Sequence, residues 1–182
     1  VNIAQELARE RPNLTTPISV SKEDISKLNS INPNRFDVKK INLYNKYDRD
    51  ILAAMEELKS AGESPNPKLI KGLMLTETGM IPRKNSKGFE GFPQTKMKFV
   101  RDVNKKYGQN FKKSDLYNAK QSAKFIHYML KAQKRSRYVN DTKEALAAYN
   151  WGMGHWKKYK TGKKPLPKET SDYVKLISAF AR

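Results

Sequence analysis

One glutamate in this sequence lies where acid–base chemistry is favoured. Ile70, Leu73 and Met74 have helical spacing in the stretch LIKGLMLTETGM, and Glu77 takes the next place on the same apolar stripe. Burial disfavours the ionised form of a carboxyl group, so we expect the pKa of Glu77 to lie above its ordinary value of roughly 4.3. A raised pKa is what a general acid needs near neutral pH.

The element that positions Glu77 is predicted to be a helix over residues 67–78. Asn66 is placed to cap its first turn, Pro67 suits the first helical position, and Gly79 ends it. The glutamate then lies at the carboxyl end of the helix. The helix dipole disfavours a negative charge there, so dipole and desolvation both favour the protonated carboxyl.

The rest of the chain also has helical periodicity, and it contains no convincing hairpin or alternating strand. We therefore predict an all-α fold. Besides residues 67–78, capping residues and apolar spacing predict a short helix after Ser21, helices over 38–59, 95–107, 115–135 and 142–150, a lysine-rich connector, and a last helix that reaches Phe180.

Composition limits the partners of such a protein. With 182 residues, one domain with an appendage is the best expectation, and a net charge of +19 favours polyanions such as nucleic acid, an anionic membrane surface or a bacterial envelope. The absence of cysteine excludes disulfides, thiolate metal sites and a cysteine nucleophile. No apolar run approaches ~20 residues, so we expect no transmembrane segment and see no signal-peptide core.

Four blocks of sequence together resemble a known family. SPNPKLIKGLMLTETGM, GFEGFPQT, ALAAYNWGMG and LPKETSDYVKLI, in this order, resemble the lytic transglycosylase catalytic domain of the lysozyme-like superfamily. The resemblance implies a lysozyme-like all-α catalytic domain over residues 64–182. Residues 1–63 are then expected to form an N-terminal helical extension packed on that domain.

The resemblance also implies roles for individual residues. It makes Glu77 the sole catalytic acid/base, and it assigns substrate binding to five residues of the matched motifs: Thr78, Gln94, Tyr149, Asn150 and Tyr173. Pro93, where the family has methionine, and Trp151, where it has a small residue, depart from the pattern and leave the contacts of their loops open. Glu169 and Thr170 match a glutamate and a threonine that we interpret as structural.

The implied reaction cleaves the β-1,4 bond between N-acetylmuramic acid and N-acetylglucosamine in peptidoglycan. Glu77 would protonate the bridging oxygen with help from the sugar acetamido group, and would then accept the C6 hydroxyl proton as an anhydro ring closes. No cofactor or metal is implied. One alternative is a muramidase that hydrolyses the same bond with water, using Glu90 or another carboxylate, although a solvated loop position is favoured for Glu90. A less favoured alternative is a stem-peptide endopeptidase, for which no catalytic apparatus is evident.

Two other functional classes, a zinc enzyme and a nucleic-acid-binding module, are alternatives to this interpretation. His127 and His155 could bind zinc, but no HExxH motif or paired spacing supports a metal site. Basic residues alternate with aromatics in KKYGQNFKK and HWKKYKTGKK, as in a nucleic-acid-binding module, yet basic residues occur on every predicted helix and no specific nucleic-acid motif is present. Trp151 and Trp156 could stack on sugars, with a packing role expected for at least one.

We therefore expect a monomer whose partners are peptidoglycan glycan strands and the anionic cell-envelope surface. Its place of action would be the bacterial periplasm or wall, reached either from the bacterium or from a phage virion or lysis machinery. The loose motif matches and the positive charge favour a phage lysin, and both origins stay open.

Overall fold

The computed structural model describes residues 15–182, and every regular element in that range is a helix, as predicted. The one extended pairing there is an isolated bridge between Glu90 and Thr95. Within the same range no helix is both long and apolar enough to cross a bilayer. Residues 1–14, part of the expected extension, lie outside the described residues.

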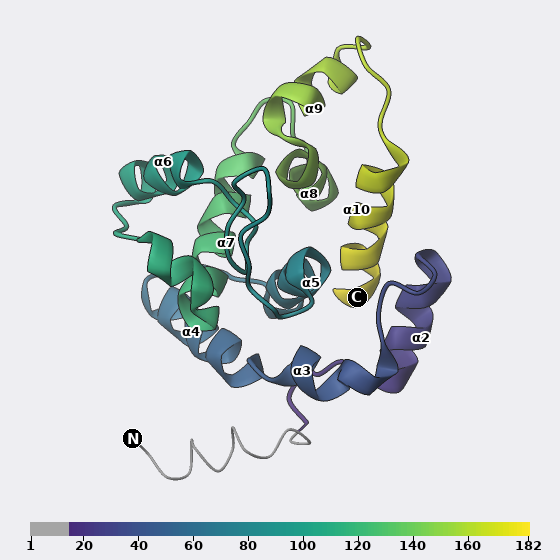
Figure 1. Ribbon diagram of the computed structural model, residues 1–182. Helices are drawn as coiled ribbons and strands as arrows, with labels where there is room; N and C mark the ends of the chain where they lie inside the picture. Colours follow the sequence, from purple (N-terminus) through teal and green to yellow (C-terminus); the bar gives the residue numbers. More distant parts are fainter. Residues whose placement is uncertain (1–14) are drawn as a thin grey trace.

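In chain order the elements are α2 (Lys22–Ile31), η1 (Val38–Lys40), α3 (Ile41–Asn45), α4 (Asp48–Ser60), α5 (Pro67–Thr78), α6 (Met97–Tyr107), η2 (Lys113–Tyr117), α7 (Ala119–Lys134), α8 (Thr142–Trp151), α9 (Met153–Lys160) and α10 (Lys168–Phe180) (Figure 1).

Helix α5 lies at the centre of the molecule, in contact with α4, α7 and α10 (Figure 1). Most of its residues are buried, and Leu73 and Met74 expose no surface at all. Gly72 allows α10 to come close, because a Cβ at this position would lie 3.0 Å from Phe180 Cδ1. Truncating Leu73 to alanine in so tight a core would destabilise the protein by about 2–5 kcal/mol.

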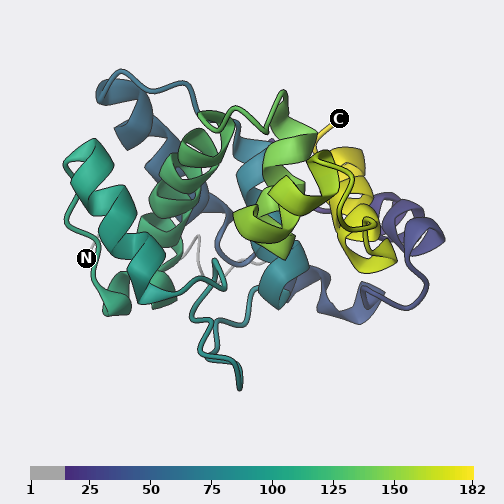
Figure 2. The same ribbon diagram turned by 90° about the horizontal axis from the view of Figure 1, so that it is seen from above.

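The short helix predicted after Ser21 is α2, and it packs against α10 (Figure 2). Ser21 and Asp24 form a capping box, in which the Asp24 N–H donates to Ser21 Oγ and the Ser21 N–H donates to the Asp24 carboxylate. Ile25 and Leu28 bury the inward edge of the helix. The residues before α5 therefore share the core of the residues after it.

A buried ion pair ties the amino-terminal part of the described chain to α5. Lys71 Nζ lies 2.6 Å from Asp48 Oδ1 and 2.6 Å from Asn45 Oδ1, with no exposed surface on the lysine side chain. The other Asp48 oxygen accepts a hydrogen bond of 2.8 Å from Thr16, and Asn45 exchanges two hydrogen bonds with the backbone of Val20. Burial lowers the pKa of Lys71 to about 8, although the Asp48 carboxylate opposes this shift.

The single helix predicted over residues 38–59 is wrong, because the segment contains η1, α3 and α4 with a break at Lys46 and Tyr47. The stripe behind that prediction included Asp48 among its apolar positions. Asp48 does face inward, but as the partner of Lys71 at the first position of α4. Its carboxylate therefore lies at the start of a new helix, where the dipole favours a negative charge.

Two other predicted boundaries also differ from the structure. The helix expected over 115–135 begins at Ala119, since Asn118 caps it and Asp115 belongs to the separate turn η2. The connector expected after the WGMG glycines is instead α9. Gly152, at φ +96°, ends α8, and α9 starts at the next residue and buries Trp156.

Candidate active site

Glu77 lies in the last turn of α5, as its sequence position predicts. Asn66 Oδ1 accepts from the Leu69 N–H at the first turn, and Pro67 is the first helical residue. Gly79 ends the helix with φ +58°, a conformation that glycine adopts without strain, and its N–H donates to the Leu75 carbonyl. The glutamate is thus carried on the most buried helix, at the end where a second negative charge is least favoured.

The carboxyl group opens into a cavity of about 560 Å³ at the carboxyl end of α5. Residues of α5, α8, α10 and the turn after α2 line it: Asn32, Arg35, Thr76, Glu77, Asn150, Lys168, Glu169, Asp172, Tyr173 and Leu176. The structure therefore brings together three of the predicted site residues, Glu77, Asn150 and Tyr173, from three different helices.

Desolvation raises the pKa of Glu77 from its ordinary 4.5 to about 8. Part of the side chain is open to the cavity, yet protein surrounds the carboxyl closely enough for desolvation to dominate. The charges of Arg35 and Arg83 and the hydroxyl of Tyr173 oppose the increase, whereas the charge of Glu169 adds to it. At neutral pH the carboxyl is therefore mostly protonated, and cationic and hydroxyl groups stand close by to stabilise its ionised form.

Two arginines bind the last carbonyl groups of α5. Arg35 Nη2 donates to the Thr76 carbonyl, and Arg83 makes longer contacts of 3.4 and 3.5 Å with the carbonyls of Thr78 and Glu77. Cationic groups at this end complement the helix dipole. Neither arginine was predicted as a site residue, since neither lies in a matched motif.

Tyr173, on α10, presents a buried hydroxyl to Glu77. It is close enough to favour the ionised carboxyl, but it forms no hydrogen bond of regular geometry with any described residue. Desolvation raises its own pKa well above 10, and the charge of Glu77 adds to this effect. A buried hydroxyl without a partner is rare in proteins, and here it faces the cavity that contains the candidate acid.

Tyr149 and Asn150 lie in the last turn of α8, and their side chains bind different partners. The Tyr149 hydroxyl donates a 2.7 Å hydrogen bond to the Pro93 carbonyl, so the proline that departs from the family pattern serves as a backbone acceptor. Desolvation raises the pKa of Tyr149 well above 10, with a further increase from the charge of Glu77. Asn150 Oδ1 accepts from the Thr170 hydroxyl at 2.9 Å, which leaves the Asn150 amide N–H groups without a hydrogen bond within residues 15–182.

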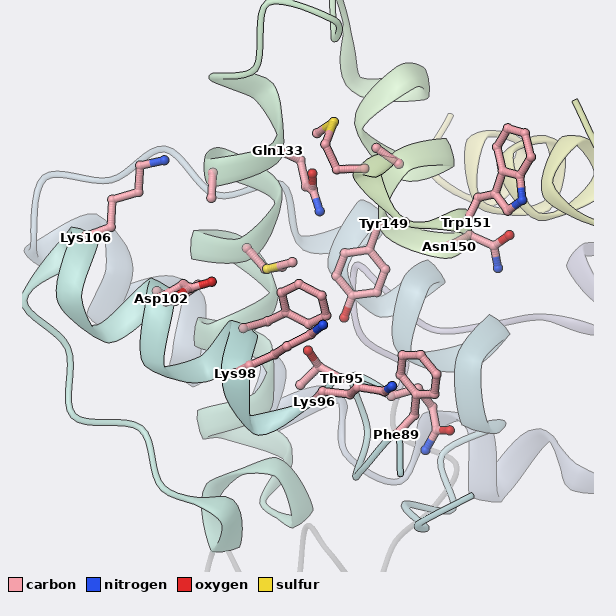
Figure 3. Close-up of a pocket in the computed structure, with 18 residues that line it drawn as sticks. Phe89, Thr95, Lys96, Lys98, Asp102, Lys106, Gln133, Tyr149, Asn150 and Trp151 are labelled. Atoms are coloured by element: carbon pink, nitrogen blue, oxygen red, sulfur yellow. The ribbon is translucent and has the colours of Figure 1, made fainter. Parts of the chain in front are cut away.

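A second cavity, of about 420 Å³, adjoins the first at Asn150, which lines both (Figure 3). Tyr149 points into this cavity, and Trp151 lies at its edge (Figure 3). Lysines and aromatic rings form much of the wall, including Phe89, Lys96, Lys98, Phe99 and Lys106. The two cavities together offer a carboxyl group, an apolar surface and cationic groups along one path.

Gln94 lies on the second cavity rather than beside Glu77. Its amide nitrogen donates to the carbonyls of Arg83, at 2.6 Å, and Gly91, at 3.0 Å, so it holds the loop in shape while its backbone adopts φ +48°. Gly91 is required at its position, because a Cβ there would lie 2.1 Å from the Leu116 carbonyl oxygen.

Thr78 is buried and lines neither cavity. Its hydroxyl donates to the Met74 carbonyl at 3.1 Å, one turn earlier in α5. The structure thus places Thr78 next to Glu77 in sequence but gives its hydroxyl a partner within the helix.

Glu90 is not the solvated loop residue that the sequence favoured. Its side chain is only 6% exposed, with Lys84 and Lys113 3.7 and 3.6 Å from Oε1, and it lines neither cavity. Glu90 pairs with Thr95 in the isolated bridge, and both residues are buried. The carboxyl groups that do share the cavity with Glu77 are those of Glu169 and Asp172, on the same face of α10 as Tyr173.

Each of the two histidines contacts other side chains of the protein. His127 Nε2 is 2.8 Å from Glu63, which also binds Lys131, and His155 stacks on Trp151 with ring centroids 5.4 Å apart. Among the described residues no group of three or more histidines, aspartates or glutamates could hold a metal ion. Trp156 packs in the core, and its indole N–H donates to the Tyr138 carbonyl.

An all-helical fold with one protonated glutamate at the end of its buried central helix, open to a cleft, is the arrangement of the lysozyme-like enzymes. The chain belongs to the Transglycosylase SLT domain family, whose model matches residues 55–171. It is therefore a lytic transglycosylase that cleaves the glycan strands of peptidoglycan, and it acts at the cell envelope. No curated protein matches the chain.

Proposed function

We propose that the enzyme cleaves the β-1,4 bond between N-acetylmuramic acid and N-acetylglucosamine with Glu77 alone as acid/base, and that it leaves anhydro-muramoyl ends. The observation that carries this proposal is a carboxyl group with a pKa of about 8 in an open cavity. At neutral pH that group holds its proton and can deliver it to the bridging oxygen as the bond from C1 to that oxygen breaks.

The same group serves the second half of the reaction. After donation, Glu77 is a carboxylate whose high pKa makes it a good base, while Arg35, Arg83 and Tyr173 favour its charge. It takes the proton of the C6 hydroxyl, and the C6 oxygen bonds to C1. The acetamido group of the sugar assists the departure, so no protein nucleophile is needed.

The substrate contacts follow from the two cavities. Asn150 offers amide N–H groups at the junction, and Tyr173 offers its hydroxyl beside Glu77. Tyr149 supplies a ring surface in the second cavity. Gln94 supplies Oε1 there, an oxygen that accepts no hydrogen bond within residues 15–182. For Thr78 we propose support of the helix end, because its hydroxyl is bound to Met74.

Hydrolysis with water is the second candidate, and one observation favours it. Glu169 lines the cavity of Glu77, is exposed to solvent and could position a water molecule. Glu90, the candidate second carboxyl of the muramidase alternative, lies outside both cavities.

The test is the mass of the products from purified walls. Anhydro ends, lighter by one water than reducing ends, support the proposal, as does a loss of activity in Glu77→Gln far beyond tenfold, or ~1.4 kcal/mol of barrier. Glu90→Gln, which removes a buried carboxyl outside the cavities, is the matched control and should stay near the parent rate. Reducing ends together with a crippled Glu169→Gln variant would replace the transglycosylase reaction by hydrolysis.

We also propose that residues 1–63 are an N-terminal helical extension packed on a catalytic domain of residues 64–182. The contact between α2 and α10 and the Lys71–Asp48 pair support the packing of residues 15–63 on that domain. The net charge of +19 supports a lysin that is drawn to an anionic wall, with phage origin favoured.

A further inference from the structure

Arg35 reaches the Glu77 cavity from a turn that precedes the family match, which begins at residue 55. The turn is held rigidly: the Asn29 side chain accepts from the Phe36 N–H at 2.9 Å and donates to the Phe36 carbonyl at 2.8 Å. Phe36 is buried and packs edge to face on Tyr44, with ring centroids 5.8 Å apart. A side chain presented by so fixed a backbone is positioned before any substrate arrives.

Only part of the guanidinium group of Arg35 is used by the protein. One nitrogen, Nη2, donates to the Thr76 carbonyl, and the guanidinium carbon lies 5.7 Å from the centroid of the Phe36 ring. No carboxylate among residues 15–182 lies within ion-pair distance of this group. Guanidinium carries five N–H donors in a planar fork, so most of them remain available at the wall of the cavity.

The other cationic side chains at or near the cavity bind partners within the protein. Lys168 lies 2.6 Å from Asp172, and Arg83 binds carbonyls of α5 without lining the cavity. Of the cations that line this cavity in the described chain, Arg35 is the one without a carboxylate partner. The cavity therefore combines an acid, Glu77, with an arginine free to bind an anion.

We propose that Arg35 binds a carboxylate of the substrate and that the segment before the family match thereby sets the enzyme's preference for anionic glycan. This inference rests on the proposed function, because it places the muramic acid residue in the Glu77 cavity. A carboxylate fits the fork in a bidentate manner. Two sources carry this chemistry: the lactyl group of a muramic acid without its peptide, and the acidic groups of an attached stem peptide.

Three glycan substrates separate these sources. The first has free lactyl carboxylates, the second has them converted to neutral primary amides, and the third carries stem peptides. With Arg35→Gln we expect kcat/KM to fall by about 10- to 100-fold on the substrate whose carboxylate is bound, the effect of losing a charged hydrogen bond. On the neutral amide substrate the variant should lose only the smaller factor that comes from the support Arg35 gives to ionised Glu77, and Arg35→Lys should recover part of the loss.

Arg83→Gln is the matched control. Arg83 also binds α5 carbonyls and favours ionised Glu77, but it does not line the cavity, so its removal should change all three rates by the same factor. A loss confined to the free lactyl substrate assigns the lactyl carboxylate, and a loss confined to the peptide-bearing substrate assigns the stem peptide. An equal loss on all three substrates with Arg35→Gln, or no loss on any, would overturn the proposal. If Glu77→Gln kept the parent's activity, the proposed function itself would fail, whatever the outcome for Arg35.

Discussion

Replacing Glu77 by glutamine should change how the stability of the protein depends on pH, independently of any effect on activity. In the folded parent the carboxyl has a pKa of about 8, whereas in the unfolded chain it returns to 4.5. The folded state thus binds the proton more tightly. The stability that this proton supplies is complete below pH 4.5 and is lost as the pH rises through about 8.

The size of the effect follows from the two pKa values. The folded and unfolded pKa values of Glu77 differ by about 3.5 units, and at ~1.36 kcal/mol for each pKa unit this corresponds to ~5 kcal/mol of stability. This value is an upper limit, because part of Glu77 faces a cavity that water can enter. We expect about 2–5 kcal/mol. Since glutamine has no proton to lose, the free energy of unfolding of Glu77→Gln minus that of the parent should rise by this amount between about pH 5 and about pH 9.

Urea unfolding followed by circular dichroism measures this difference, because urea leaves the ionic strength of a strongly basic protein unchanged. Parent and variant are compared at several pH values across this range. Glu56→Gln, at an exposed glutamate of α4, serves as the control and should run parallel to the parent. If the difference for Glu77→Gln stayed constant within about 0.5 kcal/mol, the folded protein would not hold Glu77 protonated at neutral pH, and the argument for a single general acid would collapse.

Three further predictions concern other parts of the molecule. Lys71→Met should lower the free energy of unfolding by about 3–5 kcal/mol in urea, because it leaves the Asp48 carboxylate buried without its partner; a loss below ~1 kcal/mol would mean that water reaches the aspartate. Gly91→Ala should destabilise by more than ~2 kcal/mol in thermal unfolding and slow wall lysis, because its Cβ would collide with the Leu116 carbonyl; an unchanged melting temperature would contradict the close approach. Lysis of whole walls should fall severalfold as salt rises to several hundred millimolar, since charges are screened beyond ~10 Å at 0.1 M; turbidity assays would show this, and equal salt sensitivity on neutral glycan fragments would exclude recruitment by charge.

The central part of the site could be predicted because the residues that determine it are close together in the sequence. The Asn66 cap, Pro67 and Gly79 fix the ends of α5, and the apolar stripe places Glu77 on its inner side. The resemblance then supplied Tyr173, which the structure brings to the same cavity from a distant helix.

The parts that were missed depend on tertiary contacts. Nothing in the sequence around Arg35 points to a site, because its role comes from where the Asn29–Phe36 turn meets the end of α5. Glu169 could have been found from its spacing of four residues from Tyr173, which puts both on one face of α10. Glu90 looked solvated because neither its burial nor its lysine neighbours can be read from a glycine-rich loop.

The breaks in the helices have a similar origin. The pattern over residues 38–59 is continuous in hydrophobicity, and only the pairing of Asp48 with Lys71, 23 residues later, explains why a new helix starts there. Gly152 ends α8, but Gly154 lies inside α9, and we attribute the continued helix to the burial of Trp156 on its first turn.

The Lys71–Asp48 pair has a consequence for anyone who transplants this catalytic module into a chimeric lysin. A fusion that started at residue 55, where the family match begins, would carry the lysine on its central helix but leave the aspartate behind. It would also lack the arginine at the mouth of the cleft. Such a fusion would have a charged amine facing an apolar interior and should misfold or aggregate on expression, whereas a fusion that keeps residues 15–54 retains both partners. The unit that folds is thus larger than the unit that sequence families recognise, and modular engineering of this enzyme should cut before Thr16, the outermost residue that binds the aspartate.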